Sequence, residues 1–144
     1  MKCGILLTDL SKAFDCLRHD LLIAKLNAYG FSYNSLKLIY SYLSGRFQRT
    51  RVNSSFSDWI RLIFGVPQGS VLGPELFNYN SNDLFLFIFL DVINFADDNS
   101  PFSICKTIPC VIQNLETESK ILLEWFKSNG LVANPEKFNL ILSD

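Results

Sequence analysis

Two adjacent carboxylates, Asp97 and Asp98, directly follow the apolar run 92–96. Asp9 occupies a similar position, because it ends the apolar run 3–8. If the two runs form neighbouring strands, three carboxylates converge at one edge of a sheet. The alternative is that the two carboxylates and the polar residues after them form an ordinary hairpin turn, since Asp and Asn favour turns.

Converging carboxylates need a cation, because two such charges ~4 Å apart repel each other by about 4 kcal/mol at an effective dielectric constant of ~20. Oxygen ligands favour Mg²⁺ or Mn²⁺ over zinc. Two such ions ~3.5–4 Å apart activate an attacking hydroxyl and stabilise a leaving phosphate oxygen. The chain has one histidine, His19, which we interpret as structural, and no Ser-His-Asp or Cys-His arrangement. The residue types therefore favour metal-assisted phosphoryl transfer.

The composition indicates one compact globular domain. The 144 residues are 49% hydrophobic and include 13 Phe with only 5 Pro and 7 Gly, which excludes a disordered chain. The net charge of −1 excludes nucleic-acid binding by bulk positive charge. A local basic cluster remains at Arg46, Arg49, Arg51 and Arg61. These arginines either follow a nucleic-acid backbone or form a solvated charged surface.

The cysteines and the apolar runs indicate where in the cell the protein is expected and whether it spans a membrane. Cys3, Cys16, Cys105 and Cys110 fit neither a CxxC zinc pattern nor a dense disulfide framework. We expect buried, reduced thiols in an intracellular protein of the nucleus or cytoplasm. The longest apolar run, 84–96, is interrupted by polar residues and is shorter than the ~20 residues of a membrane-spanning helix. We expect no membrane association.

Periodicity and turn residues predict strands and helices interleaved along one continuous unit. The first half is expected to contain a strand at 3–8, helices at 21–28 and 35–43, a hairpin of 47–52 with 59–64 and a shaped loop at 65–74. Residues 76–89 fit either a helix or a strand, and we favour a helix that ends near 84. The remainder is expected to contain a strand at 92–96, a tight turn at 97–100, a strand at 101–105, a helix at 113–127 and a strand at 138–142. This order predicts an α+β sheet with helices packed on one face.

Three segments carry distinctive motifs: residues 7–15 (LTDLSKAFD), 65–74 (GVPQGSVLGP) and 95–98 (FADD). They resemble consecutive palm motifs of reverse transcriptases, with non-LTR (LINE-type, jockey-like) retrotransposons giving the nearest likeness. Residues 125–137 are similar to the next motif of the family. The order and the spacing match, and the resemblance covers 6–142. It implies a polymerase palm-like antiparallel sheet and RNA-directed DNA polymerase (nucleotidyltransferase) activity.

The resemblance also implies roles for single residues. Asp9, Asp97 and Asp98 would be catalytic and would bind two Mg²⁺ (or Mn²⁺) ions, and Lys137 would face the leaving pyrophosphate. Alternatively, Lys137 is a solvated surface residue. The motif further implies nucleotide-binding residues: Phe14 against the sugar, and Gln68 and Gly69 near the nascent base pair. The alternatives are a core aromatic residue for Phe14 and a ligand-free turn for the other two.

The implied partners are an RNA template, a DNA primer and deoxynucleoside triphosphates, with contacts from Arg46, Arg49 and Arg51 and no obligate protein partner. We expect residues 1–144 to form a single partial reverse transcriptase domain, without the start of the fingers and without the thumb, that does not extend a primer alone. Glu75 and residues 79–81 depart from the apolar residues usual after the Gly-Pro loop, and Phe138 replaces a small polar residue. The alternative function is a catalytically inactive, truncated remnant of a mobile element.

Overall fold

The computed structural model describes residues 1–95 and 98–143, and the chain divides into two compact units. Unit 1 comprises Met1–Ala13 and the chain from Ser81 onward, and unit 2 comprises Phe14–Asn80. Unit 1 therefore contains the acidic segments expected at the site, and unit 2 contains the loop 65–74. Across the described residues, every helix is too short or too polar to cross a membrane.

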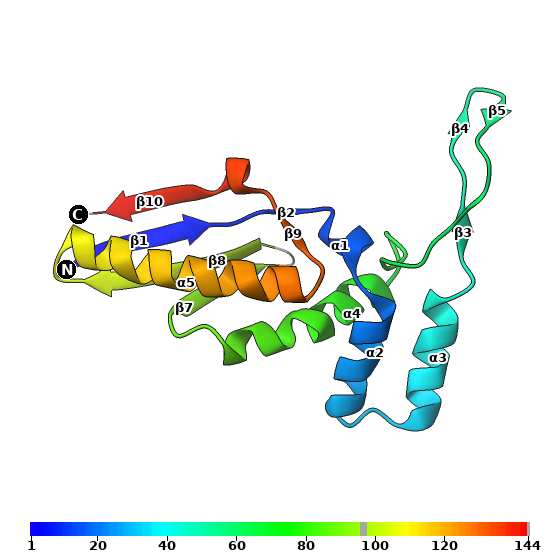
Figure 1. Ribbon diagram of the computed structural model, residues 1–144, viewed down its shortest axis with the longest axis horizontal. Coiled ribbons are helices and arrows are strands. Elements are labelled where there is room, and N and C mark those ends of the chain that lie inside the picture. The colour runs from blue at the N-terminus through cyan, green and yellow to red at the C-terminus, as the bar shows by residue number, and fades with distance from the viewer. Residues whose placement is uncertain (96–97, 144) are drawn as a thin grey trace. The chain divides into compact units, whose positions relative to one another are not determined.

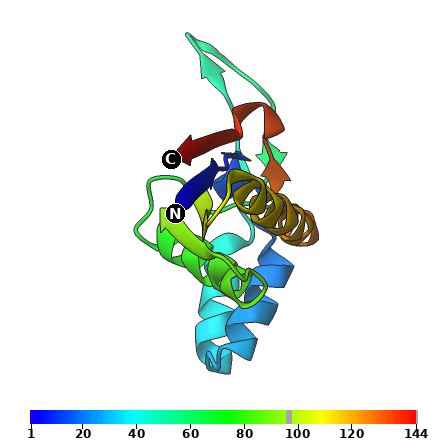
Figure 2. The same cartoon turned by 90° about the vertical axis from the view of Figure 1, so that its left-hand side faces the viewer.

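Unit 1 is built on a four-stranded antiparallel sheet in the order β10-β1-β8-β7. The strands are β1 (Lys2–Leu7), β7 (Asp91–Phe95), β8 (Asp98–Cys105) and β10 (Asn139–Ser143). Helix α5 (Ile108–Ser128) contacts β1 and β8 and lies along one face of this sheet in both views (Figure 1, Figure 2). The predicted α+β fold with an antiparallel sheet and helical packing on one face is confirmed.

The packing of α5 follows from its sequence. Its buried apolar side chains recur at helical spacing and are Val111, Leu115, Leu122, Trp125 and Phe126. Opposite them, β1 presents Gly4, where an added Cβ would lie only 2.5 Å from Cγ1 of Val111. The absence of a side chain at Gly4 therefore sets how closely the helix approaches the sheet.

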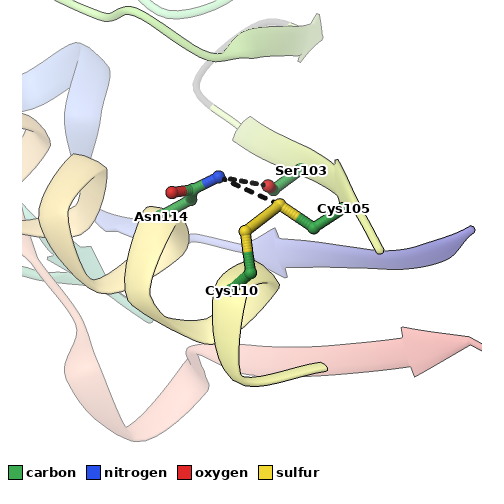
Figure 3. Close-up of a disulfide and its surroundings, with 4 residues drawn as sticks. All are labelled: Ser103, Cys105, Cys110 and Asn114. Atoms are coloured by element: carbon green, nitrogen blue, oxygen red, sulfur yellow. Dashed lines mark hydrogen bonds between the residues drawn. A yellow bond between two sulfur atoms is a disulfide. The ribbon is translucent and has the colours of Figure 1, made fainter. Parts of the chain in front are cut away.

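A disulfide joins Cys105, at the end of β8, to Cys110 in the first turn of α5 (Figure 3). Nδ2 of Asn114 donates hydrogen bonds to Sγ of Cys105 (3.4 Å) and to Oγ of Ser103 (3.1 Å). The expectation of reduced thiols is wrong for this pair. The reason is local: the helix starts so soon after the strand that the two Cα atoms lie 6.0 Å apart, within the range that a disulfide bridges.

Unit 2 is mainly helical, with α1 (Ala13–Cys16) at its start, then α2 (His19–Ala28), α3 (Tyr33–Leu43) and α4 (Leu72–Ser81). Helices α2 and α3 pack side by side (Figure 1, Figure 2). Oγ of Ser32 caps α3 by accepting a hydrogen bond from the backbone N–H of Ser35, as expected for an N-cap serine. The most deeply buried apolar side chains of unit 2 are Leu17, Leu22, Leu26, Leu43 and Phe77.

The predicted hairpin is confirmed as a β-ribbon, residues 47–61, made of two short antiparallel pairs. β3 (Phe47–Gln48) pairs with β6 (Ile60–Arg61), and β4 (Arg51–Val52) pairs with β5 (Ser55–Phe56). Every residue of the β-ribbon is exposed. It has strand pairing without a hydrophobic core of its own.

Three predicted boundaries are wrong. α4 begins at Leu72, before the predicted 76, and is followed by the 3₁₀-helix η1 (Asn82–Leu86); α5 begins at Ile108, before the predicted 113. In both cases a proline stands in the first helical turn, where its missing N–H costs no hydrogen bond. The predicted turn 97–100 is wrong for residues 98–100, which belong to β8 and pair with β7.

Candidate active site

The pairing of β1 with β8 brings Asp9 and Asp98 to the same edge of unit 1. The register runs from Lys2↔Cys105 to Ile5↔Phe102, and continuing it by four residues sets Asp9 opposite Asp98. Both residues line a cavity of about 490 Å³. The complete lining is Leu7, Thr8, Asp9, Asp98, Ser100, Glu136, Lys137 and Asn139. Three sequence-predicted site residues are thus brought together: Asp9, Asp98 and Lys137.

The carboxylate of Asp9 is paired with a lysine. Nζ of Lys137 lies 3.1 Å from Oδ2 of Asp9, with 63% of the lysine side chain and 30% of the aspartate side chain exposed. The backbone holds the two residues together, because the N–H of Asn134 donates to the carbonyl of Asp9 at 3.0 Å. The short strands β2 (Leu10–Ser11) and β9 (Val132–Ala133) also pair, just before the 3₁₀-helix η2 (Pro135–Lys137) that carries the lysine.

The chemistry of this edge fits a hard divalent cation. Oδ2 of Asp9 is shielded from solvent and has the ammonium of Lys137 as its ion-pair partner at 3.1 Å. A carboxylate has about four lone-pair sites, so this group can also bind a cation beside the cavity. The ammonium of Lys137 already supplies positive charge there. In the described part of the chain, no three His, Cys, Asp or Glu residues cluster closely enough to hold a metal. Asp97, the third expected ligand, lies outside the described residues.

A buried hydrogen bond that the sequence analysis missed joins the two acidic segments. Oγ1 of Thr8 donates to the backbone carbonyl of Asn99 at 2.6 Å. Both residues are buried, with 4% and 3% of their surface exposed. Each is the immediate chain neighbour of a site carboxylate. The only sequence signal was a threonine and an asparagine flanking the aspartates, types that are also common in turns.

The nucleotide-binding residues expected from the resemblance belong to unit 2. The ring of Phe14 is half-buried, with its centroid 4.7 Å from that of Phe77. Gln68 and Gly69 are exposed, and Nε2 of Gln68 donates to Oδ1 of Asp15 at 2.8 Å. Gly69 has φ +78°, a conformation that favours glycine.

The loop that carries Gln68 is fixed by backbone contacts to the segment after Phe14. The N–H groups of Gly65 and Val66 donate to the carbonyls of Leu17 (2.7 Å) and Phe14 (2.9 Å). Gly65 also has φ +78°, and a Cβ there would lie 2.8 Å from the carbonyl oxygen of Asp15. The loop is therefore a preformed structure, as its Gly and Pro content predicted.

His19 belongs to the same network. Its Nε2 lies 2.7 Å from the carbonyl oxygen of Gly65, and because a carbonyl only accepts, Nε2 carries the proton. The ring is buried. The structural interpretation of His19 agrees with this contact.

The predicted nucleic-acid arginines have different surroundings. Arg46 donates to the carbonyls of Leu43 (3.2 Å) and Gly65 (3.1 Å) and thereby ties the start of the β-ribbon to the loop. The guanidinium carbon of Arg49 lies 4.0 Å from the ring centroid of Phe56 and 4.6 Å from that of Trp59. Arg51 lies 5.5 Å from the ring centroid of Phe56 and donates to the carbonyl of Asn53 at 2.8 Å.

Comparisons in sequence connect the chain to known polymerases. The family model described as reverse transcriptase (RNA-dependent DNA polymerase) matches residues 1–143. The chain is 39% identical over 82 residues to the probable RNA-directed DNA polymerase from transposon BS of Drosophila melanogaster, which covers 57% of this chain and 9% of that protein. It is 25% identical over 145 residues to the retrovirus-related Pol polyprotein from type-1 retrotransposable element R2 of Popillia japonica, covering 90% of this chain and 22% of that protein.

Solved structures with the same fold include telomerases. Apo telomerase from Candida tropicalis, truncated from the C-terminal domain, superposes with a TM-score of 0.75 at 15% identity, over 99% of this chain and 31% of that one. Telomerase from Candida albicans, in complex with a fragment of telomeric RNA, gives 0.70 at 17% identity, over 98% of this chain and 27% of that one. At such identities the likeness shows the fold alone.

The chain spans between about a tenth and a fifth of the length of the curated relatives that it matches. The family model, by contrast, covers nearly the whole of this chain. The chain belongs to the reverse transcriptase family, and its relatives from transposon and retrotransposable elements confirm the resemblance to the polymerases of non-LTR retrotransposons.

Proposed function

We propose that this chain is the palm portion of an RNA-directed DNA polymerase, which transfers deoxynucleotides from their triphosphates to the 3′-hydroxyl of a DNA primer on an RNA template. The observation that carries the proposal is the shared cavity of Asp9, Asp98 and Lys137 in unit 1. Two oxygen ligands and a cationic side chain at one sheet edge are suited to a reaction in which negative charge moves between phosphate oxygens.

Reverse transcriptases generally use divalent metal ions. In the proposed mechanism, Asp9, Asp97 and Asp98 would hold Mg²⁺ or Mn²⁺, which would supply Lewis-acid chemistry to the primer hydroxyl and positive charge to the leaving pyrophosphate. Lys137 neutralises Asp9 when no substrate is bound, and it turns to the pyrophosphate as a charge or proton donor during transfer. Its exposed side chain, carried on the short helix η2, supports such a movement.

The unit 2 residues are proposed to select the nucleotide. Phe14 crowds the 2′ position of the incoming sugar, and its packing on Phe77 gives the ring a fixed orientation suited to that role. Gln68 and Gly69 contact the nascent base pair; both are exposed on a loop with a fixed backbone.

The β-ribbon is proposed to contact the nucleic acid. Four arginines and one aspartate lie between residues 46 and 61, in a chain whose overall charge is −1. Arg49 and Arg51 are exposed beside aromatic rings, a combination that suits a phosphate backbone with unstacked bases. Arg46, which is held by two carbonyls, serves mainly to orient the β-ribbon.

Manganese binding tests the proposed site without requiring the rest of a polymerase. Free Mn²⁺ is measured by electron paramagnetic resonance during titration of the wild type, Asp9→Asn, Asp98→Asn and the control Asp58→Asn, an exposed carboxylate of the β-ribbon. We expect saturable binding to the wild type and to the control, and an affinity about ten-fold weaker or worse for either site variant, since even residues behind the ligands contribute that much.

Circular dichroism establishes that each variant is folded. The proposal is contradicted if the folded wild type binds no Mn²⁺ saturably, or if Asp98→Asn and Asp58→Asn bind equally well. The first result would show that unit 1 has no Mn²⁺ site, and the second would show that Asp98 is not one of its ligands.

A further inference from the structure

The backbone pairing between β1 and β8 stops before it reaches the carboxylates. The last paired residues are Ile5 and Phe102, and the next residue of β8 is Pro101, which has no N–H to donate. Pro101 is fully buried between its neighbours and is paired with Val92 of β7. The ladder therefore does not fix the separation of Asp9 and Asp98, which lie four register positions further along.

One side chain rejoins the two strands at that point. The register sets Thr8 opposite Asn99, and the hydroxyl of Thr8 donates to the carbonyl of Asn99 at 2.6 Å. The side-chain oxygen of Asn99 in turn accepts from Nδ2 of Asn94, on the neighbouring strand β7, at 2.8 Å. Thr8 and Asn99 are buried, so water does not readily take over the bond.

We propose that Thr8 is a positioning residue for the metal-binding carboxylates. Through the carbonyl of Asn99, its hydroxyl holds the segment of Asp98 at a fixed distance from Asp9, replacing the one ladder bond for which Pro101 has no N–H. In this proposal Thr8 acts through the carbonyl of Asn99 and not as a ligand of the ion. This inference rests on the proposed metal site of Asp9 and Asp98 and adds the residue that sets its spacing.

The same sheet offers a matched control for a purely structural hydroxyl. Ser103 is paired with Gly4 in the same two strands, away from the carboxylates, and is 2% exposed. Its Oγ accepts a hydrogen bond from Nδ2 of Asn114 at 3.1 Å (Figure 3). Removal of this hydroxyl disturbs the packing of unit 1 without altering the link between Thr8 and Asn99.

The experiment compares Mn²⁺ affinity with thermal stability in four proteins: wild type, Thr8→Val, Thr8→Ser and Ser103→Ala. Valine keeps the shape of threonine and removes the donor, whereas serine keeps the donor. We expect Thr8→Val to bind Mn²⁺ about ten-fold more weakly, Thr8→Ser to restore most of that loss, and Ser103→Ala to bind like the wild type while melting at a lower temperature. If Thr8→Val does not fold, Thr8→Cys, with a weak donor, is expected to bind with intermediate affinity.

Two results would overturn the inference while leaving the metal site intact. One is wild-type Mn²⁺ affinity in Thr8→Val; the other is an equal loss of affinity in Ser103→Ala, which would make the effect one of general stability. If the wild type binds no Mn²⁺, both the proposed metal site and this inference are wrong. The wild-type titration alone distinguishes this outcome from the two results above.

Discussion

The carboxylate edge of unit 1 and the β-ribbon of unit 2 present their polar groups in opposite ways. At the edge, Asp9 and Asp98 are backed by buried neighbours and by the packing of α5 on the sheet. In the β-ribbon every residue is exposed, and the guanidinium of Arg49 lies over the rings of Phe56 and Trp59. Phosphoryl transfer is sensitive to displacements of about 1 Å, so its ligands need a rigid support. A surface that binds a flexible nucleic-acid chain does not need such a rigid support.

The largest expected difference between the two regions is in stability. Leu122 of α5 is fully buried, and Ile60 of the β-ribbon is 62% exposed. Leu122→Ala is expected to lower the free energy of unfolding of unit 1 by about 2–5 kcal/mol, because it leaves a cavity. Ile60→Ala is expected to change it by less than about 0.5 kcal/mol.

Urea unfolding monitored by tryptophan fluorescence measures both effects. In a Trp59→Phe background, the signal comes from the buried Trp125 of α5 and therefore reports on unit 1. Equal losses of unfolding free energy in the two variants would mean that the β-ribbon unfolds cooperatively with unit 1. The contrast in stability between the two regions would then be wrong.

The sequence predicted those features that depend on local patterns. The apolar runs that end at Asp9 and before Asp97 predicted strands β1 and β7, and the register of β1 with β8 agrees with a common edge for Asp9 and Asp98. The glycines of the loop 65–74 predicted its fixed shape, and Gly65 and Gly69 indeed have positive φ.

What the sequence did not predict depends on contacts between distant residues. Cys105 and Cys110 meet because a strand ends and a helix begins within five residues, and the start of α5 was placed too late. The bond from Thr8 to Asn99 spans 91 positions of the chain, and a polar side chain beside an aspartate gives no sign of its partner. The residue type of Asp98 predicted a turn, whereas the pairing of Phe95 with Asp98 makes Asp98 the first residue of β8.

The next effect concerns the β-ribbon alone. Arg49→Gln removes the guanidinium between Phe56 and Trp59 and one positive charge of a proposed phosphate contact. The affinity for a short single-stranded RNA is expected to fall several-fold, and the slope of log affinity against log salt concentration is expected to decrease by about 1. Unfolding of unit 1 is expected to stay unchanged.

Fluorescence anisotropy of a labelled oligoribonucleotide at several salt concentrations measures both quantities. Lys120→Gln, an exposed cation on α5, is the charge-matched control and is expected to bind like the wild type. If both variants lose the same affinity, the β-ribbon has no special role and only the overall charge matters.

The smallest expected effect is that of an exposed ion pair in unit 2, whose carboxylate is more exposed than that of Asp9 in its pair with Lys137. Nη2 of Arg18 lies 2.6 Å from Oδ2 of Asp20, with 46% and 68% of the side chains exposed. The hydrogen bond from Arg18 lowers the pKa of Asp20 below its ordinary value of 3.8. A lowered pKa in the folded chain means that the unfolded chain binds the proton more tightly, so the pair stabilises the fold fully at pH values above 3.8 and loses this effect as the pH falls through the lower folded pKa.

Asp20→Asn is therefore expected to melt slightly below the wild type at neutral pH and to melt at the same temperature in strong acid. The difference is small because solvent screens both charges, and it is expected to shrink further in 1 M salt, where the Debye length is about 3 Å. Arg18→Gln is expected to reproduce the loss, and the double variant to add nothing to it. Thermal melts between acid and neutral pH test this directly: a difference that grows as the pH falls would reverse the sign and exclude Arg18 as the cause of the lowered pKa.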